Sequence, residues 1–406
     1  MPYVLDTATS AGFGGLAHYD LLDRIRRFAC GYGTAGAPAK TGTGTGTMTG
    51  VDTHPATVTE TWTIICTSIA TPGAESWSVT GSVSGVKAVA TTGVAYDNGL
   101  LAFLISAGGT AWAVNDQLTV ATTAGAVGAA ARWTQLRYDT VSANRELILQ
   151  GVGLSGTEQI FVGIKCYQDS TADYYNLAVA TFTGYLAGNT FATQPGASPV
   201  LGIPAHNITI VYYLSVTGAR INMGWKVGTP VYQMAQVGKF LPFALPSTYP
   251  QPLIAAGMLT SMAATRYSDT AYSTAFKGTC ANLCMRFNDG VWHTPDTHPW
   301  LNAGVPSLAI APLLRSTGTT WHLTPITLCD GTPNVYGQID GFFQVVGFNN
   351  VVENVIQRGG SSVVDPTGLT LAQICAAITA VGGTPYIVLQ DVWRTGFADL
   401  IAMEMT

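Results

Sequence analysis

The stretch ELILQGVGLSGTEQIFVGIKCYQDSTADYYNLAVATFTGY (146–185) opens the part of the chain with the strongest strand pattern. One set of alternate positions in it is apolar: Ile160, Val162, Ile164 and Cys166. Apolar side chains at every second position are typical of a strand with one buried face, because successive side chains point to opposite sides of a sheet. The sequence therefore predicts a half-buried β-sheet that begins here.

The same alternation continues through NITIVYYLSVTGARINMGWKV (207–227) and on to TPVYQMAQVG (229–238). Segments 207–216 and 220–227 each place apolar residues at every second position, and the short join Thr217-Gly218-Ala219 contains glycine. Two such runs with a short glycine-containing join are typical of a β-hairpin. We expect this hairpin to belong to the sheet around which the main domain is built.

The composition favours a subunit of a β-rich assembly. Of the 406 residues, 46 are glycine and only 10% are charged, whereas about a quarter are charged in an average soluble protein. Few charges suffice for solubility if neighbouring subunits cover much of the surface. The alternative is an extracellular β protein with a surface rich in Thr, Ser and Asn.

The charge pattern argues against several partners. The net charge is −5 and no run of Lys and Arg is long enough for a nucleic-acid groove or an anionic membrane surface. No apolar run approaches the roughly 18 residues of a membrane span. The start, MPYVLDTATS, lacks the basic and apolar regions of a secretory signal. We expect no nucleic acid and no membrane span, and a virion part released by lysis fits these features.

The first half of the chain divides into an N-terminal segment and a small module. Residues 1–42 read as an extended arm followed by a short helix at 20–30, whose RIRR run lies near its carboxyl end. Basic residues there suit the helix dipole, and anion binding is the alternative. Residues 43–122 predict a small β-sandwich with short strands and glycine turns, and the Ala/Gly-rich stretch 123–131 predicts a domain boundary.

The second half predicts a larger β-sandwich domain at 132–406. A loop-rich region at 258–336 interrupts it, and such long loops are usually functional or form interfaces. One short helix is expected at 370–380, because Thr370 and Gln373 have the spacing of a capping box. The predicted fold class is therefore all-β, with β-sandwich domains, a short N-terminal helix and a short C-terminal helix.

The segment HTPDTH (293–298) is the densest group of metal-ligand types. His293, Asp296 and His298 could face one ion if the loop curled around it. Prolines interrupt the segment and no helix presents the ligands, so an exposed or interface loop is favoured. The pair Cys280 and Cys284 lacks the spacing of a zinc knuckle.

Glycoside cleavage needs two carboxyl groups roughly 5–10 Å apart in a cleft. The candidates are Glu146, Glu158, Asp289, Asp296 and Asp340. Acidic residues are more often solvated or capping groups. GVGLSG (151–156) resembles a phosphate loop but precedes a strand pattern rather than a helix, so a hairpin connection is favoured. We predict no catalytic, cofactor-binding or metal site and no enzyme activity.

Several aromatic residues could form a sugar-stacking platform or serve as core or interface anchors. They are Tyr174, Tyr175, Tyr185, Trp225, Tyr249, Trp292, Trp300 and Trp321. The core or interface interpretation is favoured. Within the loop-rich region we expect Trp292, Trp300 and Trp321 to anchor assembly contacts, with Asp296 and His298 at a solvated rim.

Four segments resemble a class of tailed-bacteriophage virion proteins: YDLLDRIRRFACGYG, GVGLSGTEQIFVGIKCYQDSTADYYNLAVATFTGY, KFLPFALPSTYPQPLIAAG and YIVLQDVWRTGFADLIAMEM. Separately, residues 43–122 are similar to a small β module of phage head-decoration and tail proteins, with Asn115-Asp116 where that module often carries Gly-Asp. The resemblance implies a location in the virion, as a baseplate, tail or neck/collar part. Its implied partners are other virion proteins and copies of itself. Alternatives are a tail protein that binds a host surface glycan and, less favoured, a virion-associated glycan hydrolase.

Overall fold

The computed structural model describes residues 3–71, 73–227, 232–244, 251–262, 266, 276, 282–295, 321–329, 335–347, 386–390 and 400–405. These residues are mostly strands in antiparallel sheets, with one α-helix, α1 (Ala17–Ala29), near the N-terminus. The predicted all-β class and the N-terminal helix are confirmed. The helix predicted at 370–380 and much of the region 258–336 lie outside the described residues.

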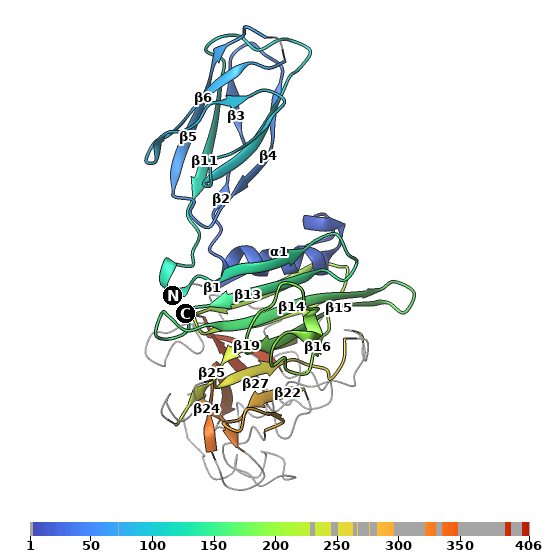
Figure 1. The fold of residues 1–406 in the computed structure, drawn as a ribbon. Helices are drawn as coiled ribbons and strands as arrows, with labels where there is room; N and C mark the ends of the chain where they lie inside the picture. The colour runs from blue at the N-terminus through green and yellow to red at the C-terminus, as the bar shows by residue number, and fades with distance from the viewer. Residues whose placement is uncertain are drawn as a thin grey trace. The chain divides into compact units, whose positions relative to one another are not determined.

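The chain forms two compact units (Figure 1). Unit 1 comprises Met1–Arg26 and Ala130–Thr406, and unit 2 comprises Arg27–Ala129. Unit 2 is therefore an insertion within the sequence of unit 1. The predicted module 43–122 lies inside unit 2, and the end of unit 2 falls within the predicted boundary stretch 123–131.

Unit 2 is a β-sandwich of two antiparallel sheets. The larger sheet has the order β2 (Thr34–Ala35), β11 (Gln117–Thr123), β5 (Glu60–Ser68), β6 (Ser76–Gly81) and β7 (Gly85–Val86), with β3 (Ala39–Thr41) on β11 and β8 (Ala90–Thr91) on β6. The smaller sheet has the order β4 (Thr47–Thr53), β10 (Leu101–Ser106) and β9 (Ala95–Asp97). Trp62 and Trp77 of the larger sheet and Phe103 of the smaller one share a core. Burial alternates along β5, β6 and β10, as the sequence predicts.

Unit 1 contains three sheets, named here I, II and III. Sheet I has the order β1 (Tyr3–Ala8), β17 (Ile210–Val216), β18 (Arg220–Val227), β19 (Tyr232–Lys239), β21 (Leu253–Ala256), β22 (Leu283–Arg286) and β23 (Trp292–His293). Sheet II has the order β12 (Thr134–Asp139), β13 (Glu146–Gly151), β14 (Ile160–Asp169), β15 (Tyr174–Phe182) and β16 (Leu201–Ile203). Sheet III contains β20 (Leu241–Pro242), β25 (Val335–Gly347), β27 (Leu400–Glu404) and β26 (Tyr386–Gln390), with β24 (Trp321–Cys329) on β25. Three 3-10 turns are also described: η1 (Phe13–Gly15), η2 (Ala129–Ala131) and η3 (Phe191–Thr193).

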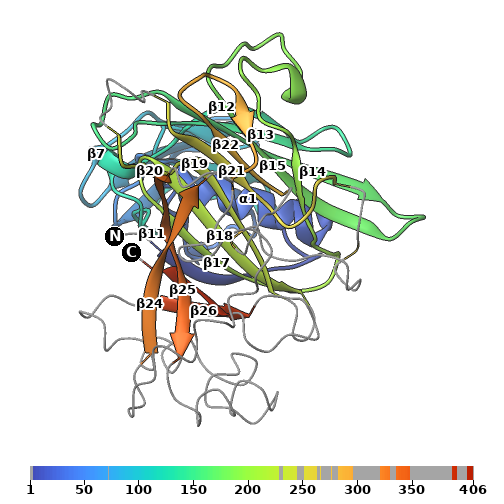
Figure 2. The ribbon, with the colours of Figure 1, turned by 90° about the horizontal axis from the view of Figure 1, so that it is seen from below.

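The predicted hairpin is confirmed as β17 and β18, which pair from Ile210↔Val227 to Val216↔Ile221. The prediction that these strands are half-buried is wrong, because β18 and β19 are buried at nearly every position on both faces. Sheet II covers one face, since the Thr181 hydroxyl of β15 donates to the Ile254 carbonyl of β21 at 2.7 Å. Sheet III contacts the other face, because Arg220 of β18 pairs with Asp340 of β25 and Gly224 of β18 faces Leu389 of β26; β25 and β26 can be followed in Figure 2.

The N-terminal residues, predicted as an arm, form the edge strand of sheet I. β1 pairs with β17 from Tyr3↔Ser215 to Ala8↔Ile210. Its side chains are largely exposed, so the sequence carries no apolar alternation there. Helix α1 follows and begins at Ala17 rather than at residue 20. Its apolar face of Leu21, Leu22 and Ile25 is fully buried.

Candidate functional site

The arginines of the RIRR run are paired with the protein's own carboxylates. Arg24 contacts Asp6 at 2.6 Å and Asp20 at 2.9 Å. Arg26 contacts Asp23 at 2.8 Å, and Arg27 contacts Asp52 at 2.6 Å. These cations are therefore neutralised within the fold, which favours the structural reading of the run over anion binding.

Glu146 and Glu158 do not face each other. Glu146 lies at one end of β13 and pairs with Lys165 at 2.8 Å, whereas Glu158 follows the other end and pairs with Lys239 at 3.0 Å. A six-residue strand spans roughly 17–20 Å, which exceeds the separation that glycoside cleavage requires. Each carboxylate is held by a lysine instead, so the arrangement suits sheet stabilisation.

The candidate metal segment is described only at its start. The His293 Nε2 lies 2.9 Å from the Asp289 carboxylate, and the ring stacks on Phe287 with 4.1 Å between centroids. Asp296 and His298 lie outside the described residues. Within the described parts of the chain, no group of three or more His, Cys, Asp or Glu side chains could hold a metal ion.

Four cysteines whose side chains the structure describes are buried. They are Cys30, Cys66, Cys166 and Cys284. Burial raises the pKa of Cys284 to about 11 and also raises the pKa of Cys166, whose Sγ donates to the His18 carbonyl at 3.6 Å. A thiol held neutral in this way is a weak nucleophile. These residues therefore act as small core side chains.

The described aromatic candidates do not form one platform. Trp225 is fully buried, with its Nε1 donating to the Pro204 carbonyl at 2.9 Å. The Trp292 Nε1 donates to the Gly196 carbonyl at 2.9 Å. Tyr185 lies under the Arg137 guanidinium at 5.6 Å. Each of these rings serves a local contact within the chain. Tyr249 and Trp300 lie outside the described residues, as does the Trp321 side chain.

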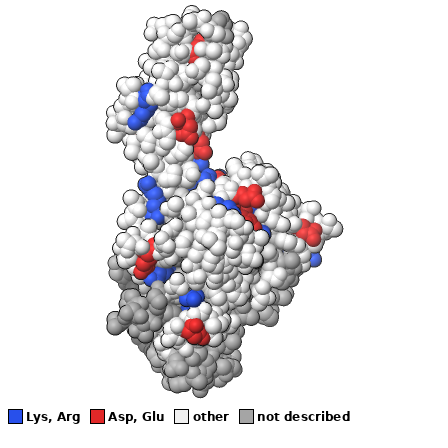
Figure 3. Space-filling model, viewed as in Figure 1, with Lys and Arg blue, Asp and Glu red and all other residues white. Residues whose placement is uncertain are grey.

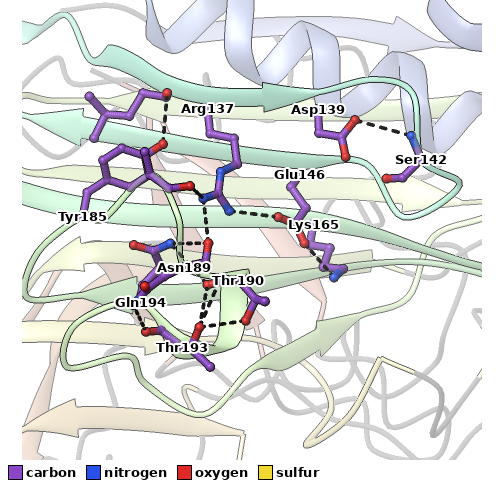
Figure 4. A network of polar contacts seen from close by, with 12 residues as sticks. Arg137, Asp139, Ser142, Glu146, Lys165, Tyr185, Asn189, Thr190, Thr193 and Gln194 are labelled. Carbon is purple, nitrogen blue, oxygen red and sulfur yellow. Dashed lines mark hydrogen bonds and ion pairs between the residues drawn. The ribbon is translucent and has the colours of Figure 1, made fainter.

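Arg137 on β12 lies at the centre of a polar network on sheet II (Figure 4). Its Nη2 donates to the carbonyls of Ala187 and Asn189 at 2.8 and 2.7 Å, and its Nη1 lies 3.3 Å from Glu146. Gln194 closes the same loop by donating to the carbonyls of Leu186, Asn189 and Thr190. The network fixes the loop 186–194 on the sheet.

That loop covers a small apolar cluster. Phe191 of the loop packs against Phe182 of β15 with 5.5 Å between ring centroids, and Ile148, Phe161 and Ala180 belong to the same cluster. Gly163 lies beneath, where a side chain would collide with the rings of Phe191 and Phe182. The Arg137 network is therefore a structural clamp over a satellite core.

A second set of polar contacts, centred on Asp340, joins sheet I to sheet III. The Arg220 guanidinium of β18 pairs with the Asp340 carboxylate of β25. The Asp340 carbonyl accepts hydrogen bonds from Asn222 at 2.9 Å and from Gln236 at 2.6 Å. Gly341 follows with φ of 76°, a conformation that favours glycine. A side chain there would collide with Arg220.

His18 is buried among aromatic and cationic groups in unit 1. The residue is fully buried, and neither ring nitrogen has a hydrogen-bond partner among the described residues. Its ring centroid lies 4.3 Å from that of Tyr19 and 5.5 Å from that of Tyr175. Burial, together with the charges of Arg145 and His206, lowers the pKa of His18 to about 3. His18 is therefore neutral near pH 7 and packs as an aromatic ring.

Asp116 organises a turn in unit 2. The buried carboxylate accepts hydrogen bonds from the amides of Thr43, Gly44 and Ala113, each at 2.9 Å. Burial alone would raise its pKa, but these amides lower the pKa below the ordinary value. Asn115 has φ of 74°, in the left-handed region. Glycine adopts this region more easily than asparagine, so a glycine at position 115 would fit this turn with less backbone strain.

The pair Asn115-Asp116 and the candidate carboxylate Asp340 stand out in the sequence, but the contacts that Arg137 and Asp340 make in the fold could not be predicted from it. Arg137 and Asp340 are isolated polar residues in strand patterns, and their partners are distant in sequence, so a local pattern gave no signal. Among the residues that the structure describes, these polar groups link sheets and loops. No described helix is long and apolar enough to cross a membrane. The chain matches no protein-family model and no curated protein.

Proposed function

We propose that this chain is a structural subunit of a tailed-bacteriophage virion, of tail, baseplate or neck/collar type. On this proposal it assembles through subunit interfaces with copies of itself and with other virion proteins. The observation that carries the proposal is a sparsely charged surface that exposes large apolar side chains on both units. The phage resemblance of the sequence supplies the particular class.

The surface of the described residues is mostly uncharged on the side shown in Figure 3. Only 10% of all residues are charged, and many of these are used in internal ion pairs. Exposed apolar side chains include Val83, Val86, Val89 and Val94 in unit 2 and Leu154, Leu186 and Phe243 in unit 1. Such a surface favours association, because few charges oppose contact and apolar area leaves water.

The candidate carboxylates support a structural role over a hydrolytic one. Glu146, Glu158 and Asp340 are each paired with a cation. A general acid or nucleophile needs access to substrate, and these groups are instead engaged with Lys165, Lys239 and Arg220.

The proposal is tested on phage particles whose genome encodes this chain. Purified particles are analysed by mass spectrometry, and antibodies raised against the chain are located on them by immunogold electron microscopy. We expect the chain in stoichiometric amounts and label on the tail, baseplate or neck. Absence of the chain from purified particles would overturn the proposal.

One observation favours a second candidate, a tail protein that binds a host surface glycan. The hairpin of β14 and β15 projects from sheet II (Figure 1), and Tyr167 and Tyr174 lie near its tip with 6.3 Å between ring centroids. Partly exposed tyrosines can stack on sugar rings. A glycan array probed with the native chain and with Tyr174→Ala tests this candidate. Loss of a specific glycan signal in the variant, with no loss in Tyr185→Phe, would support it.

A further inference from the structure

Asn98 and Gly99 lie in the loop that joins β9 to β10 in unit 2. They form the one Asn-Gly pair in the sequence. Asn98 is partly exposed, and Gly99 is exposed with φ of 76°. The main-chain amide of Asn98 donates to the Leu101 carbonyl at 3.3 Å. An asparagine side chain that precedes glycine can react with its own main chain, because glycine has no side chain to obstruct the approach.

The side-chain oxygen of Asn98 is held by two main-chain amides. Its Oδ1 accepts hydrogen bonds from Leu100 and from Leu101, each at 2.9 Å. An asparagine that reaches the amide two residues further on folds its side chain back along the main chain. The hydrogen bond to Leu100 closes a ring of atoms that includes the Asn98 Cγ and the Gly99 nitrogen. The two atoms that would react are therefore kept close together.

The same two amides are suited to stabilise negative charge on Oδ1. When a nitrogen attacks Cγ, the electron pair of the C=O bond moves onto this oxygen. Donors about 2.7–3.1 Å from a developing oxyanion lower the barrier of such a reaction. The Leu100 and Leu101 amides already lie at that distance, so the turn is preorganised for attack on Cγ.

The Asp97 carboxylate is placed to accept the proton of the attacking nitrogen. The Gly99 amide donates to the Asp97 Oδ1 at 2.8 Å, which is within the reach of a general base. The His54 Nε2 lies 3.0 Å from the same oxygen, and the Asp97 side chain is 56% exposed. The base, the electrophilic carbon and the nucleophilic nitrogen thus belong to three consecutive residues, and water has access to them.

We infer that Asn98 is a self-modification site, at which the folded turn promotes deamidation through a succinimide. The Gly99 nitrogen bonds to Cγ and gives its proton to Asp97. The Cγ–Nδ2 bond then breaks, and Nδ2 takes up a proton and leaves as ammonia. Water opens the ring at either carbonyl carbon, which gains OH while the Gly99 nitrogen regains H. The net reaction consumes one water, releases one ammonia and leaves aspartate or isoaspartate at position 98.

The products change the turn in two ways. Aspartate places a second carboxylate beside Asp97. Isoaspartate moves Cβ into the main chain and lengthens the loop, and loop length fixes the register of a hairpin. That register pairs Phe103 with Tyr96, whose rings stack in the core of unit 2 with 4.7 Å between centroids. The conversion is therefore a slow chemical change that loosens the β9–β10 hairpin.

The test follows the conversion by peptide mapping with mass spectrometry during incubation at neutral pH. The folded full chain is compared with the same chain unfolded in urea. We expect the peptide that contains Asn98 to convert at least about fivefold faster in the folded chain, because the fold holds the reacting atoms together. Asn115 is the internal control and should stay unchanged. The side chain of Asp116 obstructs the approach there, and the Asp116 amide donates to the Ala113 carbonyl at 3.0 Å.

Asp97→Asn tests the base, since an amide oxygen can still accept from Gly99 but binds a proton poorly. We expect this variant to convert roughly tenfold more slowly than the native chain, and circular dichroism checks that it is folded. A rate in the folded chain no higher than in urea overturns the inference. An Asp97→Asn rate equal to the native rate also overturns it, because solvent would then act as the base.

Thermal unfolding measures the consequence for unit 2. Asn98→Asp carries the aspartate product without lengthening the main chain. We expect an aged sample that contains isoaspartate to unfold at a lower Tm than Asn98→Asp. Equal Tm values would overturn the loosening of the β9–β10 hairpin.

Discussion

Arg220 on β18 and Asp340 on β25 form an ion pair, with 2.7 Å between Nε and Oδ2, that ties sheet I to sheet III. The Arg220 side chain is 3% exposed and the Asp340 side chain is 20% exposed. Because the Asp340 carbonyl also accepts from Asn222 and Gln236, one residue supplies both charge and backbone contacts to the neighbouring sheet. The ion pair and the two hydrogen bonds give partners to polar groups that would otherwise be buried unpaired between sheet I and sheet III.

We expect Asp340→Ala to lower the free energy of unfolding by about 3 kcal/mol, because it leaves the Arg220 charge buried without its partner. Urea unfolding followed by circular dichroism measures the change. Asp6→Ala is the matched control, because Asp6 and Arg24 form a more exposed pair, with 48% and 34% of their side chains exposed. We expect Asp6→Ala to lower the free energy of unfolding by less than about 1 kcal/mol. An equal loss in the free energy of unfolding for Asp340→Ala and Asp6→Ala would contradict the stabilising role of the Arg220–Asp340 ion pair.

His18 predicts an acid-sensitive contribution to stability. Its pKa is about 3 in the folded chain against an ordinary value of 6.5. Between these two pH values the unfolded chain binds a proton on His18 more tightly than the folded chain does. The free energy of unfolding therefore falls as the pH drops from 6.5 towards 3. The loss is of order 5 kcal/mol once the pH is below both values.

His18→Phe keeps an aromatic ring and removes the titrating group, and neither ring nitrogen has a described hydrogen bond to lose. We expect the variant to match the native chain at pH 7 and to be more stable at pH 4. Chemical unfolding at both pH values provides the measurement. His293→Gln is the control, since its side chain is 39% exposed. The prediction fails if His18→Phe and the native chain lose equal stability on acidification.

We expect a single substitution at Asp116 to lower the stability of unit 2 strongly. Asp116→Ala leaves three amide groups without their acceptor, which we expect to cost about 3 kcal/mol. The lowered pKa of Asp116 means that its contribution is present above pH 4 or so and declines as the pH falls further. Calorimetry should show a lower Tm, and Asp97→Ala, whose side chain is 56% exposed, should shift it little.

Asn115 offers a finer test of the same turn. Its φ of 74° suits glycine and opposes β-branched residues. We expect Asn115→Gly to leave stability within about 1 kcal/mol of native and Asn115→Val to lose about 2 kcal/mol or more. A valine variant as stable as the glycine variant would show that the turn is not constrained as described.

The sequence predicted those elements whose signal is local. The hairpin of β17 and β18 has regular apolar alternation and a short join that contains glycine. In β5, the alternation of buried and exposed side chains matches the alternation of apolar and polar residues in its sequence. Burial of both faces of β18 could not be predicted, because it depends on sheets II and III, which come from distant parts of the chain. The segment of β1 predicts only an extended arm, because an exposed edge strand has no apolar period. The pairings of Arg137 and Arg220 likewise follow from tertiary contacts.

Unit 2 should fold by itself. Its core contains Trp62, Trp77 and Trp112, and its internal contacts form a separate compact unit. We expect a fragment of residues 27–129 to give a cooperative thermal transition and dispersed amide signals in NMR. A fragment with neither property would show that unit 2 depends on the rest of the chain.

The two ends of unit 2 meet at their own base. β2 pairs with β11 through Ala35↔Thr122 and Thr34↔Thr123, and a side chain at Gly125 would collide with the Gly31 carbonyl. Because the first and last strands of unit 2 are paired with each other, the inserted residues begin and end close together. Such an insertion lengthens the chain without requiring a wide separation between the two residues of unit 1 that flank it. The module can therefore be removed, duplicated or exchanged at this one point of the sequence, while the sequence of unit 1 stays unchanged.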